Sequence, residues 1–112
     1  MSTFTVSATI QVPRTQVWSI LADIGAIAEW NPGVVESHLS SDAAYGIGAS
    51  RYAAMGGKYY VDEQVVEWDE EARLAVRITD TNLPFKGAVI LFALQGDDNA
   101  TSVSVTPEYK IP

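Results

Sequence analysis

The chain has 112 residues, 47% of them hydrophobic, and its seven basic and fourteen acidic residues give a net charge of −7. This length fits a single domain, residues 1–112, and the acidity argues against a nucleic-acid partner, whose phosphates are bound by clustered Lys and Arg. The lack of cysteine excludes disulfides and thiolate metal sites, and the single histidine, His38, excludes a multi-histidine metal cluster.

The first part of the chain is typical of one strand followed by two short helices. Residues 1–5 have neither the basic segment nor the apolar core of a signal peptide, which favours a cytoplasmic protein. Apolar and polar residues alternate over residues 3–12, the pattern of a half-buried strand, and Pro13 ends it. Helices are expected over Arg14–Ala22 and Ile24–Glu29, the second ending just before the next proline.

The remainder of the chain is predicted to form strands joined by hairpin turns. The longest apolar run, residues 89–94, is far shorter than the roughly 20 residues that cross a bilayer, so no membrane span is expected. With the first strand, the six strands that follow predict a seven-stranded antiparallel sheet with early helices, an α+β fold. These six strands are Val34–Ser40, Ala49–Met55, Lys58–Trp68, Arg73–Thr81, Lys86–Gln95 and Ala100–Ile111.

Several short motifs follow one another along the whole chain in a distinctive order and spacing. They are Val12-Pro13, Val17-Trp18, Leu21-Ala22-Asp23-Ile24, Glu29-Trp30-Asn31-Pro32, Gly46-x-Gly48-x-x-Arg51, Glu63-x-Val65-x-x-x-Asp69 with Arg73, and Leu83-Pro84-Phe85. In this joint order the chain resembles the START-like SRPBCC superfamily and, within it, the polyketide cyclase/dehydrase-like branch.

The resemblance implies a helix-grip fold, in which a strongly curved antiparallel sheet wraps around a long carboxy-terminal helix and encloses an apolar cavity. The chain ends at Lys110-Ile111-Pro112, where that closing helix would begin. We therefore expect a domain that lacks the long carboxy-terminal helix. A natural truncation, a fragment, and a cavity covered by another chain are all compatible with this expectation.

The hairpin around Gly56-Gly57-Lys58 fixes which side chains share a face. A three-residue loop with a left-handed glycine places Met55 opposite Tyr59, and therefore Arg51 opposite Glu63. A loop of two or four residues would shift this register by one. Because side chains alternate along a strand, one face of this hairpin carries Arg51, Ala53, Met55, Tyr59, Val61, Glu63 and Val65. This face is the more apolar of the two, so we expect it to line the cavity. In related plant abscisic acid receptors, the residue that matches Glu63 helps to line the pocket.

Arg51 and Glu63 are the polar pair of this otherwise apolar face. The arginine can hold a ligand carboxylate or ketone oxygen, or the two side chains can simply neutralise each other across the strands. The further candidate cavity walls are Met55, Tyr59, Trp30, Phe85 and Tyr109, although apolar side chains of this kind serve core packing equally well. Ligand-binding residues are thus expected at Arg51, Met55, Tyr59, Glu63, Trp30, Phe85 and Tyr109.

No other segment suggests chemistry. His38 lies on a strand with Glu36 on the same face, but no nucleophile motif accompanies it, so an exposed histidine is the favoured interpretation. The acidic turns Asp69-Glu70-Glu71 and Asp97-Asp98 lack the spacing of a calcium loop and are typical of solvated turns, with Trp68 packed at the hairpin end. We expect no catalytic residue, no metal and no cofactor.

Three functions fit this sequence. The favoured one is the binding of a small hydrophobic ligand, such as a polyketide, a lipid or an aromatic compound, in the apolar cavity. A cyclase or dehydratase would use Arg51 to polarise a carbonyl and Glu63 or Tyr59 to move protons. Against it, Gln64 or Glu63 stands where the aromatase/cyclase members carry an arginine. Thirdly, an open concave face would serve as an interaction surface, with a homodimer covering the cavity.

Overall fold

The computed structural model describes the backbone of residues 2, 3 and 5–109 and the side chains of residues 5–108. Phe4, Lys110 and Ile111, which the sequence places in the first and last strands, lie outside this part of the chain. The elements in chain order are β1 (Ser2–Thr3), β2 (Val6–Ile10), α1 (Arg14–Ala22), the 3-10 helix η1 (Ile24–Glu29), β3 (Val34–Leu39), β4 (Ser50–Met55), β5 (Tyr59–Asp69), β6 (Arg73–Thr81), β7 (Val89–Gly96) and β8 (Thr101–Tyr109).

All strands belong to one antiparallel sheet with the order β1-β8-β7-β6-β5-β4-β3, and β2 also pairs with β8. The first predicted strand is therefore divided into β1 and β2, both in the same register against β8. The described residue of this interruption is Thr5, whose hydroxyl lies 2.9 Å from that of Thr106, next to Pro107, a residue with no backbone N–H to donate to a neighbouring strand. Counting β1 and β2 together, the sheet has the seven strands that the sequence predicts.

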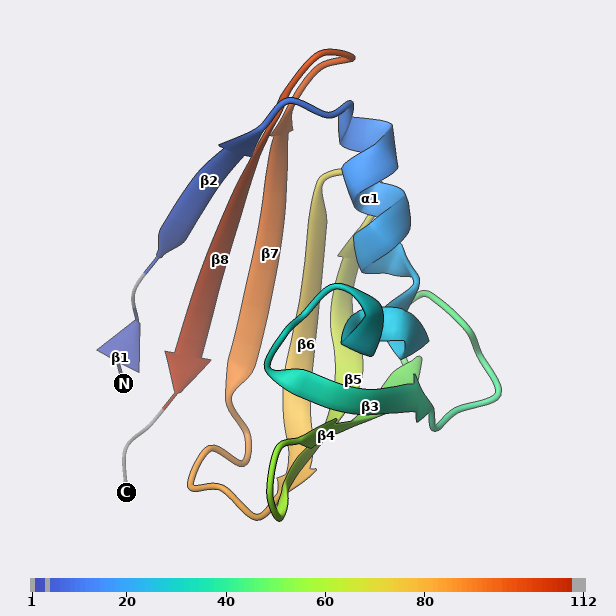
Figure 1. Cartoon of the computed structure of the whole chain (residues 1–112), viewed down its shortest axis with the longest axis vertical. Helices are drawn as coiled ribbons and strands as arrows, with labels where there is room; N and C mark the ends of the chain where they lie inside the picture. The colour runs from blue at the N-terminus through green and yellow to red at the C-terminus, as the bar shows by residue number, and fades with distance from the viewer. Residues whose placement is uncertain (1, 4, 110–112) are drawn as a thin grey trace.

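The sheet is strongly curved, and β3 runs across the direction of β7 and β8 (Figure 1). Register shifts in the ladders contribute to this bend, because an extra residue on one strand kinks it and increases its twist. In the β5–β6 ladder, Thr79 on β6 and Val66 on β5 are extra residues without a partner on the other strand. In the β3–β4 ladder, the extra residue is Val35 on β3. The two shifts in the β5–β6 ladder therefore flank Glu63 and Val65.

The two helices pack on the concave side of the sheet, α1 against β7 and η1 against β3 and β4. The buried face of α1 consists of Val17, Trp18 and Leu21. These side chains form the main core together with Ile24 of η1, Ala49 directly before β4, and four residues of the sheet, which are Val65, Leu74, Val76 and Leu94. Among the described residues, no helix is both long and apolar enough to cross a bilayer.

The β7–β8 turn holds the start of α1 in place. The backbone N–H of Arg14 donates to the carbonyl oxygen of Asp97 at 3.1 Å. The fully buried hydroxyl of Thr101 donates to the carbonyl oxygen of Val12 at 2.8 Å. These two bonds join residues 83 and 89 positions apart in sequence, so the entry into α1 depends on the shape of this turn.

Candidate ligand-binding cavity

A cavity of about 480 Å³ lies between the concave face of the sheet and the segments around η1 and the β6–β7 loop. Among its described lining residues, Arg51 and Glu63 are the only charged ones, and most of the others are apolar. The lining residues are Ile27, Trp30, Asn31, Val34, Arg51, Ala53, Met55, Val61, Glu63, Ile78, Leu83, Phe85, Ile90, Phe92 and Val105. A cavity of this size and character suits a small, largely apolar molecule.

Arg51 and Glu63 form a buried ion pair in the wall of the cavity. They face each other directly across β4 and β5, and the distance from Arg51 Nε to Glu63 Oε1 is 2.8 Å. Only 3% and 6% of the two side chains are exposed. Arg51 also donates from Nη1 to the carbonyl oxygen of Ile24 at 3.2 Å, which ties the first residue of η1 to the sheet. The pair therefore serves the fold as well as the cavity.

The same pair retains hydrogen-bonding capacity toward the cavity. Among the described residues, every buried side-chain nitrogen and oxygen has a hydrogen-bond partner. Neither Nη2 of Arg51 nor Oε2 of Glu63 makes such a bond to the described residues. Both residues line the cavity, so these two atoms are the donor and the acceptor of the pair that a ligand there could bond to.

The three-residue loop predicted at residues 56–58 is confirmed, and with it the register that places Arg51 opposite Glu63. Gly57 adopts a φ of +76°, the left-handed conformation that such a loop requires of a glycine. Of the predicted binding residues, the structure places five in the cavity wall, namely Arg51, Met55, Glu63, Trp30 and Phe85. Their role in binding stays a prediction.

Tyr59 is not part of the wall, although it shares a face with Arg51. The pairing of β5 with β6 begins only at Val61, so Tyr59 has a neighbouring strand on its β4 side alone, and 52% of it is exposed. The alternation of a strand indicates a face, and the extent of the adjacent strands decides how much of that face is covered. Tyr109 ends β8, but its side chain lies outside the described part of the chain.

Most of the opposite wall was missed by sequence reasoning. Ile78, Ile90, Phe92 and Val105 come from β6, β7 and β8, and they reach the cavity because the sheet curves around it. Alternation alone does not indicate that distant strands converge on one space. The segment Leu83-Pro84-Phe85 was the one local signal on this side, and both Leu83 and Phe85 line the cavity.

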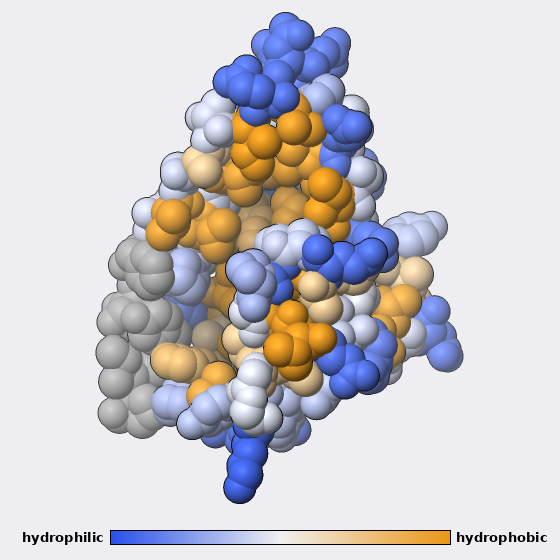
Figure 2. Space-filling model, viewed as in Figure 1, coloured by the Kyte–Doolittle hydropathy of each residue, from blue (hydrophilic) through white to orange (hydrophobic). Residues whose placement is uncertain are grey.

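An open apolar groove of about 270 Å³ adjoins the cavity and runs between β2, β8 and α1. Trp30 lines both the groove and the cavity. On this face of the molecule, apolar side chains gather around a hollow beside α1 (Figure 2). Ile10 and Ile20, which line the groove, are exposed. The concave side of the protein thus presents two apolar hollows that meet at Trp30.

His38 lies on the outer face of the sheet and is exposed, as the sequence indicates. Its ring stacks on Tyr52 with centroids 5.1 Å apart, and Tyr52 in turn stacks on Tyr60 at 6.0 Å. Partial burial and the charge of Asp80 raise the pKa of Asp62 beside this row. These side chains point away from Arg51, and among the described residues no group of His, Asp and Glu side chains could hold a metal ion.

Several solved structures share this fold. A solution structure from Thermobifida fusca is 27% identical, with a TM-score of 0.84, covering 100% of this chain and 76% of that one. A START superfamily protein from Mycobacterium smegmatis is 12% identical, with a TM-score of 0.82, covering 98% and 77% of the two chains. The Zhui aromatase/cyclase from Streptomyces sp. R1128 is 16% identical, with a TM-score of 0.84, covering 99% and 68%. At the identities of the last two, the likeness shows the fold alone.

Curated proteins give no match to this sequence. The family described as polyketide cyclase / dehydrase and lipid transport matches residues 1–112, the whole chain. This agrees with the resemblance found in the sequence motifs and with the START-like fold of the similar structures. The chain therefore belongs to the polyketide cyclase / dehydrase and lipid transport family.

Proposed function

We propose that this protein binds a small hydrophobic molecule, such as a polyketide, a lipid or an aromatic compound, in the cavity of the curved sheet. The observation that carries this proposal is an apolar cavity of about 480 Å³ with a single buried ion pair in its wall. Apolar burial would supply most of the affinity, and the ion pair would orient the ligand.

The ion pair favours a neutral polar group on the ligand over an ionised one. The charge of Arg51 is already compensated by Glu63 at 2.8 Å, so a ligand carboxylate would gain one attraction and meet one repulsion. A ketone oxygen can accept from Arg51 Nη2 without that penalty, and a hydroxyl can donate to Glu63 Oε2. Of the two oxygens that the sequence analysis left open, the geometry supports the ketone.

Isothermal titration calorimetry with two naphthalene probes tests this proposal. We expect 2-acetonaphthone, a neutral ketone, to bind at least about tenfold more tightly than 2-naphthoate, which carries a carboxylate on the same ring system. Binding of the ketone should also raise the melting temperature, because the ligand stabilises only the folded state. Tighter binding of the carboxylate would contradict the proposed role of the ion pair.

Two matched variants locate the binding site. Ala53 lines the cavity, and Ala54 is the next residue on the same strand with its side chain on the other face. Ala53→Phe should fill the cavity and weaken 2-acetonaphthone binding at least about tenfold, whereas Ala54→Phe should leave it within about twofold. Ala53→Leu gives a smaller filling should the larger ring prevent folding. Equal binding by the Ala53 and Ala54 variants would show that the ligand sits elsewhere and would refute the proposal.

A cyclase or dehydratase is the second candidate, because a guanidinium and a carboxylate both line the same apolar cavity. Arg51 would polarise a ketone and Glu63 would accept a proton from the neighbouring carbon. Tyr59, the other proton-moving residue considered, is outside the cavity wall. If a poly-β-ketone gives the same product distribution with and without the protein, this candidate is eliminated.

Three further expectations stand beside this proposal. They are that residues 1–112 form one domain, that the protein is cytoplasmic, and that two copies associate through the open concave face. The exposed groove residues Ile10 and Ile20 are the side chains that such an association would cover.

A further inference from the structure

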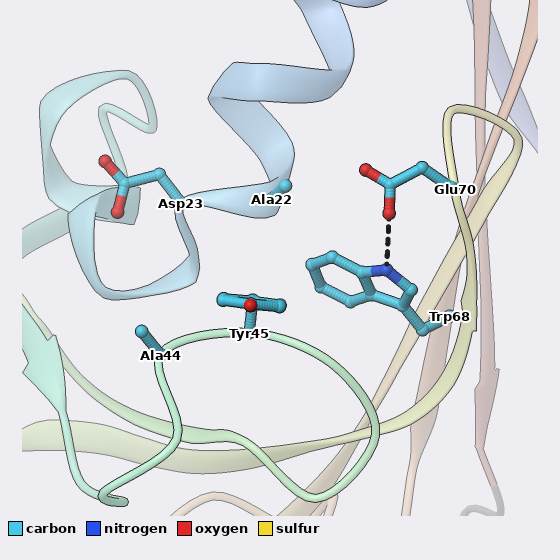
Figure 3. A pocket seen from close by; sticks show the side chains of 6 residues that line it. All are labelled: Ala22, Asp23, Ala44, Tyr45, Trp68 and Glu70. Carbon is cyan, nitrogen blue, oxygen red and sulfur yellow. Dashed lines mark hydrogen bonds between the residues drawn. The ribbon is translucent and has the colours of Figure 1, made fainter.

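A second pocket, of about 410 Å³, lies at the carboxyl end of α1 and is more open to solvent than the inner cavity. It is lined by Ala22, Asp23, Ala44, Tyr45, Trp68 and Glu70, and none of these residues lines the inner cavity. Figure 3 shows Tyr45 between Ala44 and Trp68, with Ala22 and the carboxylates of Asp23 and Glu70 on the same side of its ring. Two aromatic rings and two acidic groups therefore surround one space.

The aromatic part of this pocket is held in place. Trp68 packs edge-on against the buried Trp18, with ring centroids 5.2 Å apart and an angle of 76°. Tyr45 is tilted by 41° to Trp68 at 6.1 Å, and 71% of Tyr45 is exposed. Trp68 contributes to packing at the hairpin end, as the sequence suggests, but it also turns an aromatic surface to the pocket. The rings present electron-rich faces, which attract cations.

The charged part of the pocket is held in place as well. Glu70 accepts a hydrogen bond from each of two indole groups. Trp68 Nε1 donates to Oε2 at 3.0 Å (Figure 3), and Trp18 Nε1 donates to Oε1 at 2.8 Å. Both donors are neutral, so they position the carboxylate without cancelling its charge. Neither ion pair of the described residues involves Glu70 or Asp23.

The end of α1 adds to the negative potential. Asp23 is the residue that follows the last turn of this nine-residue helix, and the carbonyl end of a helix carries a partial negative charge. The last turn contains no basic residue that would offset it. Helix end, carboxylates and aromatic faces thus all favour the same kind of occupant, which is a positively charged one.

We propose that this outer pocket binds a small organic ammonium ion. The cation would lie over the ring of Tyr45, beside Trp68 and between the carboxylates of Asp23 and Glu70. An alkylated ammonium fits better than a metal ion because the rings offer apolar contact as well as electrostatic attraction, and few oxygen ligands converge here. This inference is independent of the ligand proposed for the inner cavity, because the two sites share no lining residue.

Binding of choline, compared with that of its neutral isostere 3,3-dimethylbutan-1-ol, distinguishes the contribution of charge from that of shape. We expect choline to perturb the NMR signals of Trp68 and Tyr45 and to bind at least about tenfold more tightly than the isostere, since the two differ essentially in charge. Binding of the isostere with equal or higher affinity would overturn the proposal, and so would the absence of choline binding at millimolar concentrations.

Two pairs of variants test the named residues. Tyr45→Leu removes the aromatic face and should weaken choline binding by about tenfold, whereas Tyr45→Phe keeps that face and should bind within about twofold of the original. Tyr45 is largely exposed, so both variants should fold.

Asp23→Asn removes one carboxylate at the pocket and should also weaken binding severalfold. Asp98→Asn changes the net charge equally, but in the β7–β8 turn, near the other end of α1. It should have little effect. Equal losses in the two Asn variants would mean that choline responds only to overall charge, and unchanged binding in Tyr45→Leu would mean that the ring is not involved. Either result would refute the site.

Discussion

Arg51→Met is expected to lower the free energy of unfolding by about 3 to 5 kcal/mol, because it leaves the buried carboxylate of Glu63 without its counter-charge. The size of the effect follows from burial, since 3% of the Arg51 side chain and 6% of the Glu63 side chain are exposed. The variant also lacks the hydrogen bond from Arg51 to the carbonyl oxygen of Ile24, which anchors η1. Urea denaturation followed by tryptophan fluorescence measures the change.

The double variant Arg51→Met with Glu63→Leu should recover much of this loss. Both charges are then absent, and apolar side chains of similar size occupy the space. The exposed pair Arg73–Glu67 is the matched control, with a distance of 2.6 Å but 45% and 42% of the side chains exposed. Arg73→Met should cost less than about 1 kcal/mol. A similar cost at Arg51 and Arg73 would show that burial does not control the strength of the Arg51–Glu63 pair.

Gly96→Ala is expected to lower the free energy of unfolding by about 2 to 4 kcal/mol, from backbone strain and overpacking together. Gly96 has a φ of +147°, and an added Cβ would collide with the backbone carbonyl oxygen of Ala100 and approach Thr101 Cα at 2.8 Å. Backbone atoms cannot rotate away as a flexible side chain can, so the turn itself must open. That turn carries the hydrogen bonds to Arg14 and Val12, so the start of α1 should loosen with it.

Gly57→Ala provides the comparison for this effect. Gly57 also has a positive φ, +76°, but no atom lies within 4 Å of an added Cβ. Its cost should be limited to the unfavourable left-handed backbone, about 1 kcal/mol. Thermal unfolding of the two variants, with hydrogen exchange at the amide of Arg14, measures both effects. Equal destabilisation at the two glycines would contradict the collision, and unchanged exchange at Arg14 would contradict the coupling to α1.

Local patterns in the sequence predicted much of the fold because they act over short distances. The glycines at 56 and 57 determine a loop length, and that loop length sets every pair between β4 and β5, including Arg51 with Glu63. The alternation of residues 6–10 likewise predicts β2. The division of the first strand was not predicted, because β8, the strand that it pairs with, lies about a hundred residues away in the chain.

The composition of the sites depends on tertiary geometry and was predicted less well. Tyr59 alternates correctly with Arg51, yet the neighbouring strand ends before it reaches this residue. Glu70 belongs to an acidic turn whose sequence is typical of a solvated turn. Only the structure shows that its carboxylate accepts hydrogen bonds from two indoles. One of those indoles belongs to Trp18, which is 52 residues away in sequence. No local pattern indicates such a contact.

The paired bulges of β5 and β6 determine where the length of these strands can change. Thr79 and Val66 are each extra to the ladder, so the loss of either one would preserve every cross-strand pair of this hairpin. Loss of a residue between them, such as Gln64, would instead turn its neighbours to the opposite face. Removing a bulge would straighten the strand beside Glu63. Single-residue changes in strand length at the two bulges would therefore alter the curvature of the cavity wall and leave the Arg51–Glu63 pair intact.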